Sequence, residues 1–448
     1  MEAHHSTISA LSFLFAFVLV TALVAVRRWR STADDAGETF IADVPFLFLH
    51  DPDWRLMGKA LSEYERELGT CLGGLSKSLE VCHISEASLG LKDGFLSQAL
   101  QTKIDILADL HDSNLELMAG LLDEFPTRKM LTETVFQDYI HDTTTDTTAQ
   151  PPLSDGPPLR TRSPPPSSSY DSVNQIVAHL VRDWTQDGTL VRSSIYDWCR
   201  SHVKGKGNSI LVPGAGLGRL GWDLARDGHS VETNEVSLTM AAVAYQLFQK
   251  RKEFTIYPFV TDFFVNEANS KLRYQSVQVK PPSDSMKGHL SYTIGDFVRL
   301  YGSPQASYYD VVVTCFFLDT ATNVLEYLAI LSNILKKGGQ WINVGPLQWH
   351  INAHLHPAAD ELREMILSFG FRIDHWSIDA EPVDYRLEDP TTVRFTKYEG
   401  YQPLRMVATK VKDTENRYPI ATIPAPQLVQ PPATRAPPVL SSVTIEEL

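Results

Sequence analysis

The sequence predicts an α/β protein with a doubly wound, mostly parallel sheet, preceded by a helical region and an N-terminal transmembrane helix. The sheet is indicated by strand and helix patterns that alternate through residues 171–412. A glycine-rich turn follows the first apolar strand of this region, at residues 210–219. Because open α/β sheets bind ligands beyond the carboxyl ends of their strands, we expect the functional site at that edge.

The glycine-rich turn has the spacing of a nucleoside site. Gly214, Gly216 and Gly218 follow an apolar strand as G-x-G-x-G, and Glu235 lies 21 positions after Gly214. In such sites the glycines bring the backbone close to the ligand, and an acid about 20 residues later binds ribose hydroxyls. The spacing differs from the dinucleotide pattern G-x-G-x-x-G, which favours a cofactor without a pyrophosphate, such as S-adenosylmethionine. The alternative is a strand-to-helix turn without a ligand.

The chain begins with a long apolar segment. Residues 8–26 carry no charge over 19 positions and could cross about 28 Å as a helix. Arg27, Arg28 and Arg30 follow, which by the positive-inside tendency keeps the rest of the chain in the cytosol. We therefore expect residues 1–35 to form an uncleaved membrane anchor with its basic flank. A cleaved signal peptide and a segment that never inserts are the alternatives.

The rest of the chain divides by composition. Residues 36–140 show apolar residues at helical spacing, which predicts two or three long helices packed on the following domain. Residues 141–170 are rich in Thr, Pro and Ser and are expected to form a disordered linker. The α/β domain occupies residues 171–412, and residues 413–448 form a proline-rich tail that we expect to be disordered.

Inside the α/β domain each expected element has its own signal. Amphipathic patterns predict helices, and short runs rich in β-branched residues predict strands. The expected helices are 173–188, 192–203, 239–251 and 324–339. The expected strands are 210–213, 230–235, 291–297, 309–319, 340–347 and 404–411.

Charge and cysteine content exclude several functions. Lys and Arg total 40 against 54 Asp and Glu, and no short window is rich in basic residues, so nucleic acid is not an expected partner. The four cysteines are too few and too scattered for a disulfide framework or a CxxC metal site. His354 and His356 lack a third ligand of clear spacing, so no metal is expected. The helical patterns do not reveal the oligomeric state, and a homodimer is one option.

Two acids follow predicted strands at the ligand edge. Asp296, with Phe297 beside it, ends the third strand, where an acid can accept from an adenine amino group while the aromatic ring covers the base. Asp319 follows the most apolar strand and faces the ligand crevice. Such a carboxylate can accept the N–H of an imidazole, fix its tautomer and leave the other nitrogen able to attack. In each case the alternative is a helix N-cap.

Two further residues near this edge are weaker candidates by themselves. His350 follows the fifth strand, but a lone histidine is more often a packed or surface residue. Cys315 lies in the fourth strand, where a small side chain suits packing next to a cofactor. No Cys/His/Asn constellation supports a nucleophilic cysteine.

Several motifs together resemble one enzyme family. The segments VRDW, VPGAGLGRL, NE, GDF, CFFLDTA and ILKKGGQWINVGPL occur in that order and are similar to those of the carnosine N-methyltransferase family. The resemblance covers roughly residues 45–412. It implies a seven-stranded class I methyltransferase sheet with added helices. It also implies transfer of a methyl group from S-adenosylmethionine to an imidazole nitrogen of carnosine, a histidine dipeptide, giving anserine.

The resemblance also implies roles for individual residues. Arg182 would hold the methionine carboxylate, Glu235 the ribose hydroxyls, and Asp319 with His350 the substrate imidazole and dipeptide. The cofactor-binding residues would be Arg182, Gly214, Gly216, Glu235, Asp296, Phe297 and Cys315. The substrate-binding residues would be Asp319, which is also catalytic, His350, Tyr398 and Tyr401.

Two other functions stay open from the sequence. The same imidazole chemistry could act on a histidine within a peptide or protein. A membrane-tethered scaffold that binds S-adenosylmethionine without turnover is the alternative of another class. Measurable methyl transfer distinguishes the enzyme from the scaffold.

Overall fold

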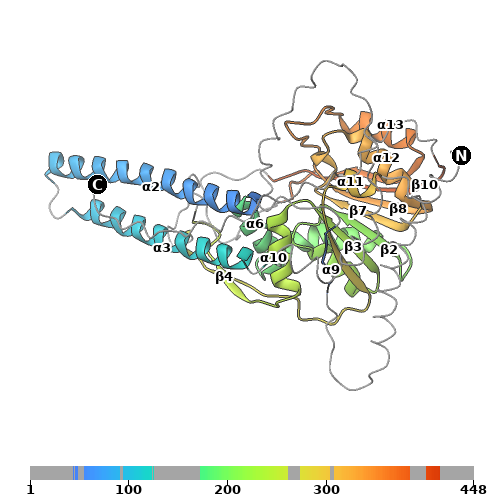
Figure 1. The fold of residues 1–448 in the computed structure, drawn as a ribbon. Helices are drawn as coiled ribbons and strands as arrows, with labels where there is room; N and C mark the ends of the chain where they lie inside the picture. Colours follow the sequence, from blue (N-terminus) through green and yellow to red (C-terminus); the bar gives the residue numbers. More distant parts are fainter. Residues whose placement is uncertain are drawn as a thin grey trace, which may run out of the picture. The chain divides into compact units, whose positions relative to one another are not determined.

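A computed structural model describes most of the region between residues 44 and 413. The described residues are 44, 46–48, 55–90, 94–123, 125, 172–260, 273–302, 307–383 and 400–413. Figure 1 shows two long helices and an α/β region built around one large sheet. The predicted linker and Tyr398 lie outside the described residues, as does nearly all of the predicted tail.

The large sheet has eight strands among the described residues, in the order β1-β6-β3-β2-β7-β8-β10-β9. Its neighbours pair in parallel except at β10, which is antiparallel to both β8 and β9. The strands are β1 (Phe46–Phe48), β2 (Ser209–Pro213), β3 (Ser230–Glu235), β6 (His289–Ile294), β7 (Tyr309–Cys315), β8 (Leu335–Gly345), β9 (Phe371–Ile378) and β10 (Leu404–Lys410). The mostly parallel sheet is therefore as predicted, but it has one strand more than the seven expected, because β1 adds to the edge beside β6.

Helices follow the strands and cover the sheet. α9 packs on β3 and β6, α10 on β3, α12 on β8 and α13 on β9. The central strand β7 is buried at nearly every position, as expected for a parallel strand covered on both faces. The helices of this region are α6 (Val173–Trp184), α7 (Thr189–Arg192), α8 (Trp198–His202), α9 (Arg219–Arg226), α10 (Leu238–Phe248), α11 (Phe297–Tyr301), α12 (Val324–Ile334) and α13 (Ala359–Ser368). A π-helical turn, η3 (Ser193–Asp197), joins α7 to α8, and a 3-10 turn, η5 (Leu318–Thr320), follows β7.

Several predicted boundaries are wrong: the helix expected over 173–188 ends at Trp184, and the strand expected over 291–297 ends at Ile294. The helix expected to continue to the glycine pair at 338–339 ends at Ile334, and Leu335 is already extended. β8 therefore begins before the glycines rather than after them. Ile334 and Leu335 are apolar residues that suit either a helix or a strand, so the pattern alone does not place the boundary.

The N-terminal helical region contains an antiparallel hairpin of α2 (Arg55–Leu89) and α3 (Phe95–Asp123), which run side by side in Figure 1. Both helices contact α10. Asn114 on α3 donates to the Tyr257 carbonyl and accepts from the Tyr257 N–H at 2.9 and 3.0 Å. Tyr257 follows the strand β4 (Phe254–Ile256), which pairs with β5 (Val277–Val279) in a separate two-stranded sheet. The hairpin is thus tied to the α/β region by buried polar contacts as well as by packing.

The predicted transmembrane helix is not supported. In the part of the chain that the structure describes, no helix combines the length and apolar character needed to cross a bilayer. Residues 8–26 lie outside the described residues. An apolar run gives only the preference of a segment for lipid, so the predictions of a membrane anchor and of a membrane-anchored location are withdrawn.

Candidate active site

The glycine-rich turn after β2 is built from left-handed backbone. Gly214, Gly216 and Gly218 have φ of 63°, 54° and 76°, a region that residues with a Cβ rarely adopt. A Cβ on Gly214 would lie 2.4 Å from the Phe317 ring, and one on Gly218 would lie 2.8 Å from the Phe248 ring. The turn therefore needs glycine for both its conformation and its packing.

Glu235 closes the turn from the neighbouring strand. Its carboxylate accepts from the Gly216 N–H at 2.8 Å and from the N–H groups of Val236 and Ser237 at 2.9 and 2.8 Å. The side chain is 7% exposed, at the end of β3. A carboxylate offers about four acceptor positions, so these three bonds are compatible with one more donor. The predicted ribose acid thus lies directly beside the predicted glycine turn.

Asp296 and Phe297 follow β6 at the same edge of the sheet. Asp296 is exposed and caps α11 by accepting from the Arg299 N–H at 2.9 Å, which is the N-cap alternative considered from the sequence. Phe297 is buried and meets the Phe317 ring edge to face at 5.2 Å between centroids. Phe297 therefore packs beneath the glycine turn, and the exposed Asp296 lies at the edge of this turn.

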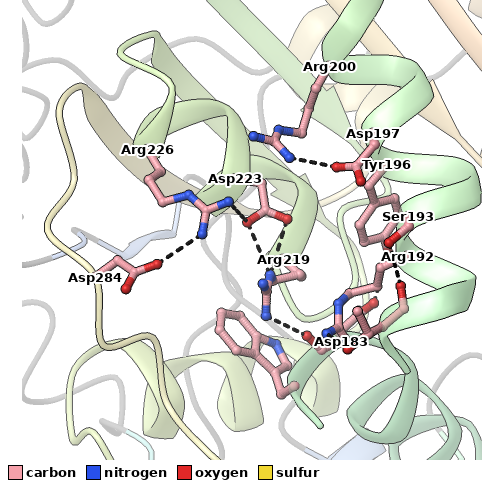
Figure 2. A network of polar contacts seen from close by, with 12 residues as sticks. Asp183, Arg192, Ser193, Tyr196, Asp197, Arg200, Arg219, Asp223, Arg226 and Asp284 are labelled. Atoms are coloured by element: carbon pink, nitrogen blue, oxygen red, sulfur yellow. Dashed lines mark hydrogen bonds and ion pairs between the residues drawn. The ribbon is translucent and has the colours of Figure 1, made fainter. Parts of the chain in front are cut away.

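Arg182 occupies the last turn of α6. Its Nε and Nη2 donate to the two carboxylate oxygens of Asp183 at 2.6 and 2.7 Å, and both side chains are buried. Asp183 also accepts from the Tyr196 hydroxyl at 2.8 Å. Figure 2 shows Asp183 and Tyr196 within a larger network of arginines and acids. This pairing could not be predicted from the sequence, since neighbouring residues on a helix point in different directions.

α6 is also joined to the glycine turn itself. The Trp184 indole donates to the Leu217 carbonyl at 3.2 Å. His179, one turn before Arg182, lies beside Gly216, where an added Cβ would come within 3.3 Å of its Nδ1. Desolvation and the nearby Arg182 charge lower the pKa of His179 to about 3, so its ring is neutral. The face of α6 that carries His179 and Arg182 therefore borders the turn.

Asp319 lies in η5, directly after β7. It is 8% exposed, and its Oδ2 accepts from the Gln348 N–H at 3.2 Å. Burial raises the pKa of Asp319 to about 6, although hydrogen bonds from its own backbone and from Gln348 oppose the shift. The His350 N–H donates to the Asp319 carbonyl at 3.1 Å. The two residues predicted to hold an imidazole are therefore joined through their backbones.

The backbone between β7 and Asp319 is strained. Phe316 has φ of 52°, which is unusual for a residue with a Cβ, and its N–H donates to the Val344 carbonyl at 2.8 Å. The Phe316 ring meets the Tyr401 ring at 5.6 Å between centroids. Tyr401, predicted from the loosely spaced segment before β10, is thus brought next to the β7 end. Cys315 is the last residue of β7, and Tyr398 lies outside the described residues.

Comparisons with known proteins identify the family of the chain. The family model of carnosine N-methyltransferase matches residues 160–400, more than half of the chain. The chain belongs to the carnosine N-methyltransferase family. The resemblance identified from the sequence motifs is thereby confirmed, and the mixed sheet described above is the class I methyltransferase-like fold that this family implies.

Individual members of the family match only parts of their length. The carnosine N-methyltransferase unmet of Drosophila melanogaster is 34% identical over 215 residues, which are 44% of this chain and 46% of the fly protein. The carnosine N-methyltransferase of Mus musculus is 31% identical over 258 residues, 51% of this chain and 62% of the mouse protein. The chain thus spans about half to three fifths of these relatives.

A solved structure also aligns with the chain, with low similarity. It is a complex between the Haloferax volcanii Trm112 methyltransferase activator and the putative methyltransferase, at 14% identity and a TM-score of 0.36. It covers 53% of this chain and 96% of that chain.

The residues at the edge fit the cofactor that a methyltransferase needs. Three left-handed glycines expose backbone at the turn, Glu235 offers a carboxylate beside it, and Arg182 places a cation on the bordering helix face. A diol and a carboxylate are the groups of S-adenosylmethionine that call for an acid and a cation. Among the described residues, no cluster of three or more His, Cys, Asp or Glu side chains is arranged to hold a metal ion.

Proposed function

We propose that this member of the carnosine N-methyltransferase family transfers a methyl group from S-adenosylmethionine to an imidazole nitrogen of carnosine or a related histidine dipeptide. The observation that carries the proposal is Asp319, a buried acid with its pKa raised to about 6 beside the glycine-turn edge. An acid so placed is ionised near pH 7 and can bind the N–H of a neutral imidazole.

The cofactor would be held by residues at the carboxyl ends of β2, β3, β6 and β7. Glu235 would bind the ribose hydroxyls, Arg182 the methionine carboxylate and Asp296 the adenine amino group. We also propose that four further residues bind the cofactor. They lie in the glycine turn, under it or at the end of β7, and are Gly214, Gly216, Phe297 and Cys315. When bound, S-adenosylmethionine supplies an electrophilic methyl group on a sulfonium.

Asp319 would orient the substrate ring. Its carboxylate accepts one imidazole N–H and so leaves the lone pair of the other nitrogen directed away from the acid. As the ring becomes cationic, its attraction to the carboxylate grows, which stabilises the transition state more than the bound substrate. The low exposure of Asp319 strengthens this attraction, because little water screens the charges.

The remainder of the dipeptide would contact residues on the segments beside Asp319. His350 is linked to Asp319 through the backbone, and Tyr401 is held against Phe316 by its ring and to Val383 by a pair of backbone hydrogen bonds. Tyr398 is proposed for the same role from the sequence alone. We propose that these residues select for the dipeptide around the ring that Asp319 holds.

The test is transfer of labelled methyl from S-adenosylmethionine to carnosine by the full chain. Wild type should form product, Asp319→Ala should not, and the exposed Asp360→Asn on α13 serves as a matched control that keeps activity. NMR of the product identifies the methylated nitrogen. Transfer to histidine-containing peptides but not to carnosine would change the assigned substrate from a dipeptide to a peptide histidine. Cofactor binding without transfer to either would refute the proposed activity.

A further inference from the structure

The ion pair between Arg182 and Asp183 is unusually well fixed for two neighbouring residues. The two parallel hydrogen bonds of 2.6 and 2.7 Å engage one edge of the guanidinium and hold its plane in a single orientation. Asp183 is 0% exposed and Arg182 is 7% exposed. A guanidinium has five N–H donors, so this pairing is compatible with a second carboxylate bound to Arg182.

Asp183 is also held by η3. The Tyr196 hydroxyl donates to its Oδ1 at 2.8 Å, the same oxygen that accepts from Arg182 Nε. Tyr196 lies in the π-helical turn, a local widening of a helix that often occurs at functional sites. The turn aims the Tyr196 side chain at the end of α6 and thus completes a chain from Tyr196 through Asp183 to Arg182.

Other arginines hold the end of α6, and Figure 2 shows them around Asp183. Arg219, the first residue of α9, donates to the Asp183 carbonyl at 3.0 Å, and Arg192 donates to the carbonyls of Arg182 and Thr185. These bonds satisfy carbonyl groups that a helix end leaves without partners. The last turn of α6 is therefore fixed to the helix that begins at the glycine turn.

The charge of this cluster favours an anionic ligand group. Burial works to raise the pKa of Asp183, but the adjoining Arg182 charge prevails and lowers it, so Asp183 is a carboxylate. Asp183 neutralises Arg182 and Asp223 pairs with Arg219, while Arg192, which donates to backbone carbonyls, adds a further positive charge at the same helix end. An Asp183 without its charge would leave Arg182 with neither its orientation nor its counter-ion.

We propose that Asp183 is a positioning residue for cofactor binding: it orients the Arg182 guanidinium toward the amino-acid carboxylate of S-adenosylmethionine, and Tyr196 holds Asp183 in place. The inference rests on the proposed cofactor site. In this proposal Asp183 does not contact the ligand. It orients Arg182, which does. Only the amino-acid part of the ligand should be affected. A general effect on the fold would instead weaken the binding of every part of the ligand.

The test compares two ligands by calorimetry on the full chain. S-adenosylhomocysteine carries the amino-acid group, and 5′-methylthioadenosine shares the adenosine and thioether but lacks that group. Asp183→Asn should raise the Kd of S-adenosylhomocysteine about tenfold or more, a loss of about 1.4 kcal/mol, while the Kd of methylthioadenosine changes less than about twofold. Tyr196→Phe removes only one hydroxyl and should show the same selectivity with a smaller change.

Asp223→Asn is the matched control. Asp223 is also buried and belongs to the same network, but it pairs with Arg219 and Arg226. It should leave the ratio of the two Kd values near that of wild type. Because the readout is binding, it does not depend on which substrate receives the methyl group.

The outcomes separate this proposal from the proposed function. Wild type that binds neither ligand would refute the cofactor site itself. Wild type that binds S-adenosylhomocysteine, with an Asp183→Asn variant that binds it equally well, would overturn only the positioning role. Equal weakening of both ligands in Asp183→Asn and Tyr196→Phe, or the same selective loss in Asp223→Asn, would show a general structural role and would also overturn it. If Asp183→Asn does not fold, Tyr196→Phe decides the question alone.

Discussion

Replacing Asp319 by Asn should make the folded protein more stable near neutral pH while removing most of its turnover. The acid is buried, and burial raises its pKa from 3.8 to about 6. An acid whose pKa is raised by folding binds protons more tightly in the folded state. Its ionisation therefore costs stability as the pH rises from below the unfolded pKa to above the folded one.

The size of this cost follows from the shift. A rise of about two pKa units corresponds to about 3 kcal/mol of lost stability once Asp319 is ionised in the folded protein, because each unit is worth about 1.4 kcal/mol. The cost is nearly complete at pH 7.5 and falls to about 1 kcal/mol at pH 4.5. Asn keeps an oxygen that can accept from the Gln348 N–H, but its amide adds donors that cost about 1 kcal/mol if they lack partners. We expect a net gain of about 2 kcal/mol at pH 7.5.

Urea unfolding of wild type and Asp319→Asn at pH 4.5 and pH 7.5 measures this difference. The variant should be the more stable protein at pH 7.5, and its advantage should shrink by about 2 kcal/mol at pH 4.5. Turnover of carnosine by the variant should fall by about 100-fold or more, since a neutral amide gains little attraction to the ring as it becomes cationic. The exposed Asp360→Asn should change neither quantity.

Two results would refute the reasoning. A variant that is less stable than wild type at pH 7.5 would show that Asp319 stabilises the fold as an ion. An advantage that does not change with pH would show that the substitution acts through packing. In either case the raised pKa could not be the feature that prepares Asp319 for the imidazole.

Three further outcomes are expected. In wild type, kcat/KM for carnosine should fall as the pH drops through about 6, where both Asp319 and the substrate imidazole take up protons; pH profiles should show a shallower acid limb in Asp319→Asn. Gly214→Ala should weaken cofactor binding measured by calorimetry and lower the thermal midpoint, because its Cβ would strike Phe317. Glu232→Gln should cost about 1–3 kcal/mol in urea unfolding without selective loss of cofactor affinity, since Glu232 accepts from Tyr301, Tyr309 and Thr293 away from the glycine turn.

The sequence was most informative for residues whose spacing along the chain determines their distance in the fold. The glycine spacing and Glu235 could be read together because a strand, a turn and the next strand fix their distance, and the structure joins them through the Gly216 N–H. The central strands were likewise visible as apolar runs. β9 was missed because it is half exposed and its pattern alternates only weakly. β1 was missed because three residues give no periodicity.

The site residues that the sequence did not reveal depend on tertiary contacts. Asp183 adjoins Arg182 in sequence, where side chains on a helix diverge, so only the folded structure shows that the long arginine turns back to it. Tyr196 points to Asp183 because of a π-helical turn, and no residue type in the sequence predicts such a turn. The pKa of Asp319 is raised because the side chain is buried beside β7 and β8. This burial depends on the tertiary fold and cannot be predicted from the local sequence CFFLDT.

The strained Phe316 explains how one short segment can serve two ligands. A residue with a Cβ in left-handed backbone costs about 1–3 kcal/mol and persists only where its surroundings fix it. Here the Val344 carbonyl accepts its N–H, and Gly345 leaves so little space that an added Cβ would come within 3.1 Å of Phe316 backbone atoms. The bend directs Phe317 onto Gly214 and places Asp319 beside the segment that carries His350. The strained bend therefore lets this short segment pack Phe317 on the glycine turn and place the Asp319 carboxylate where we propose that it meets the substrate.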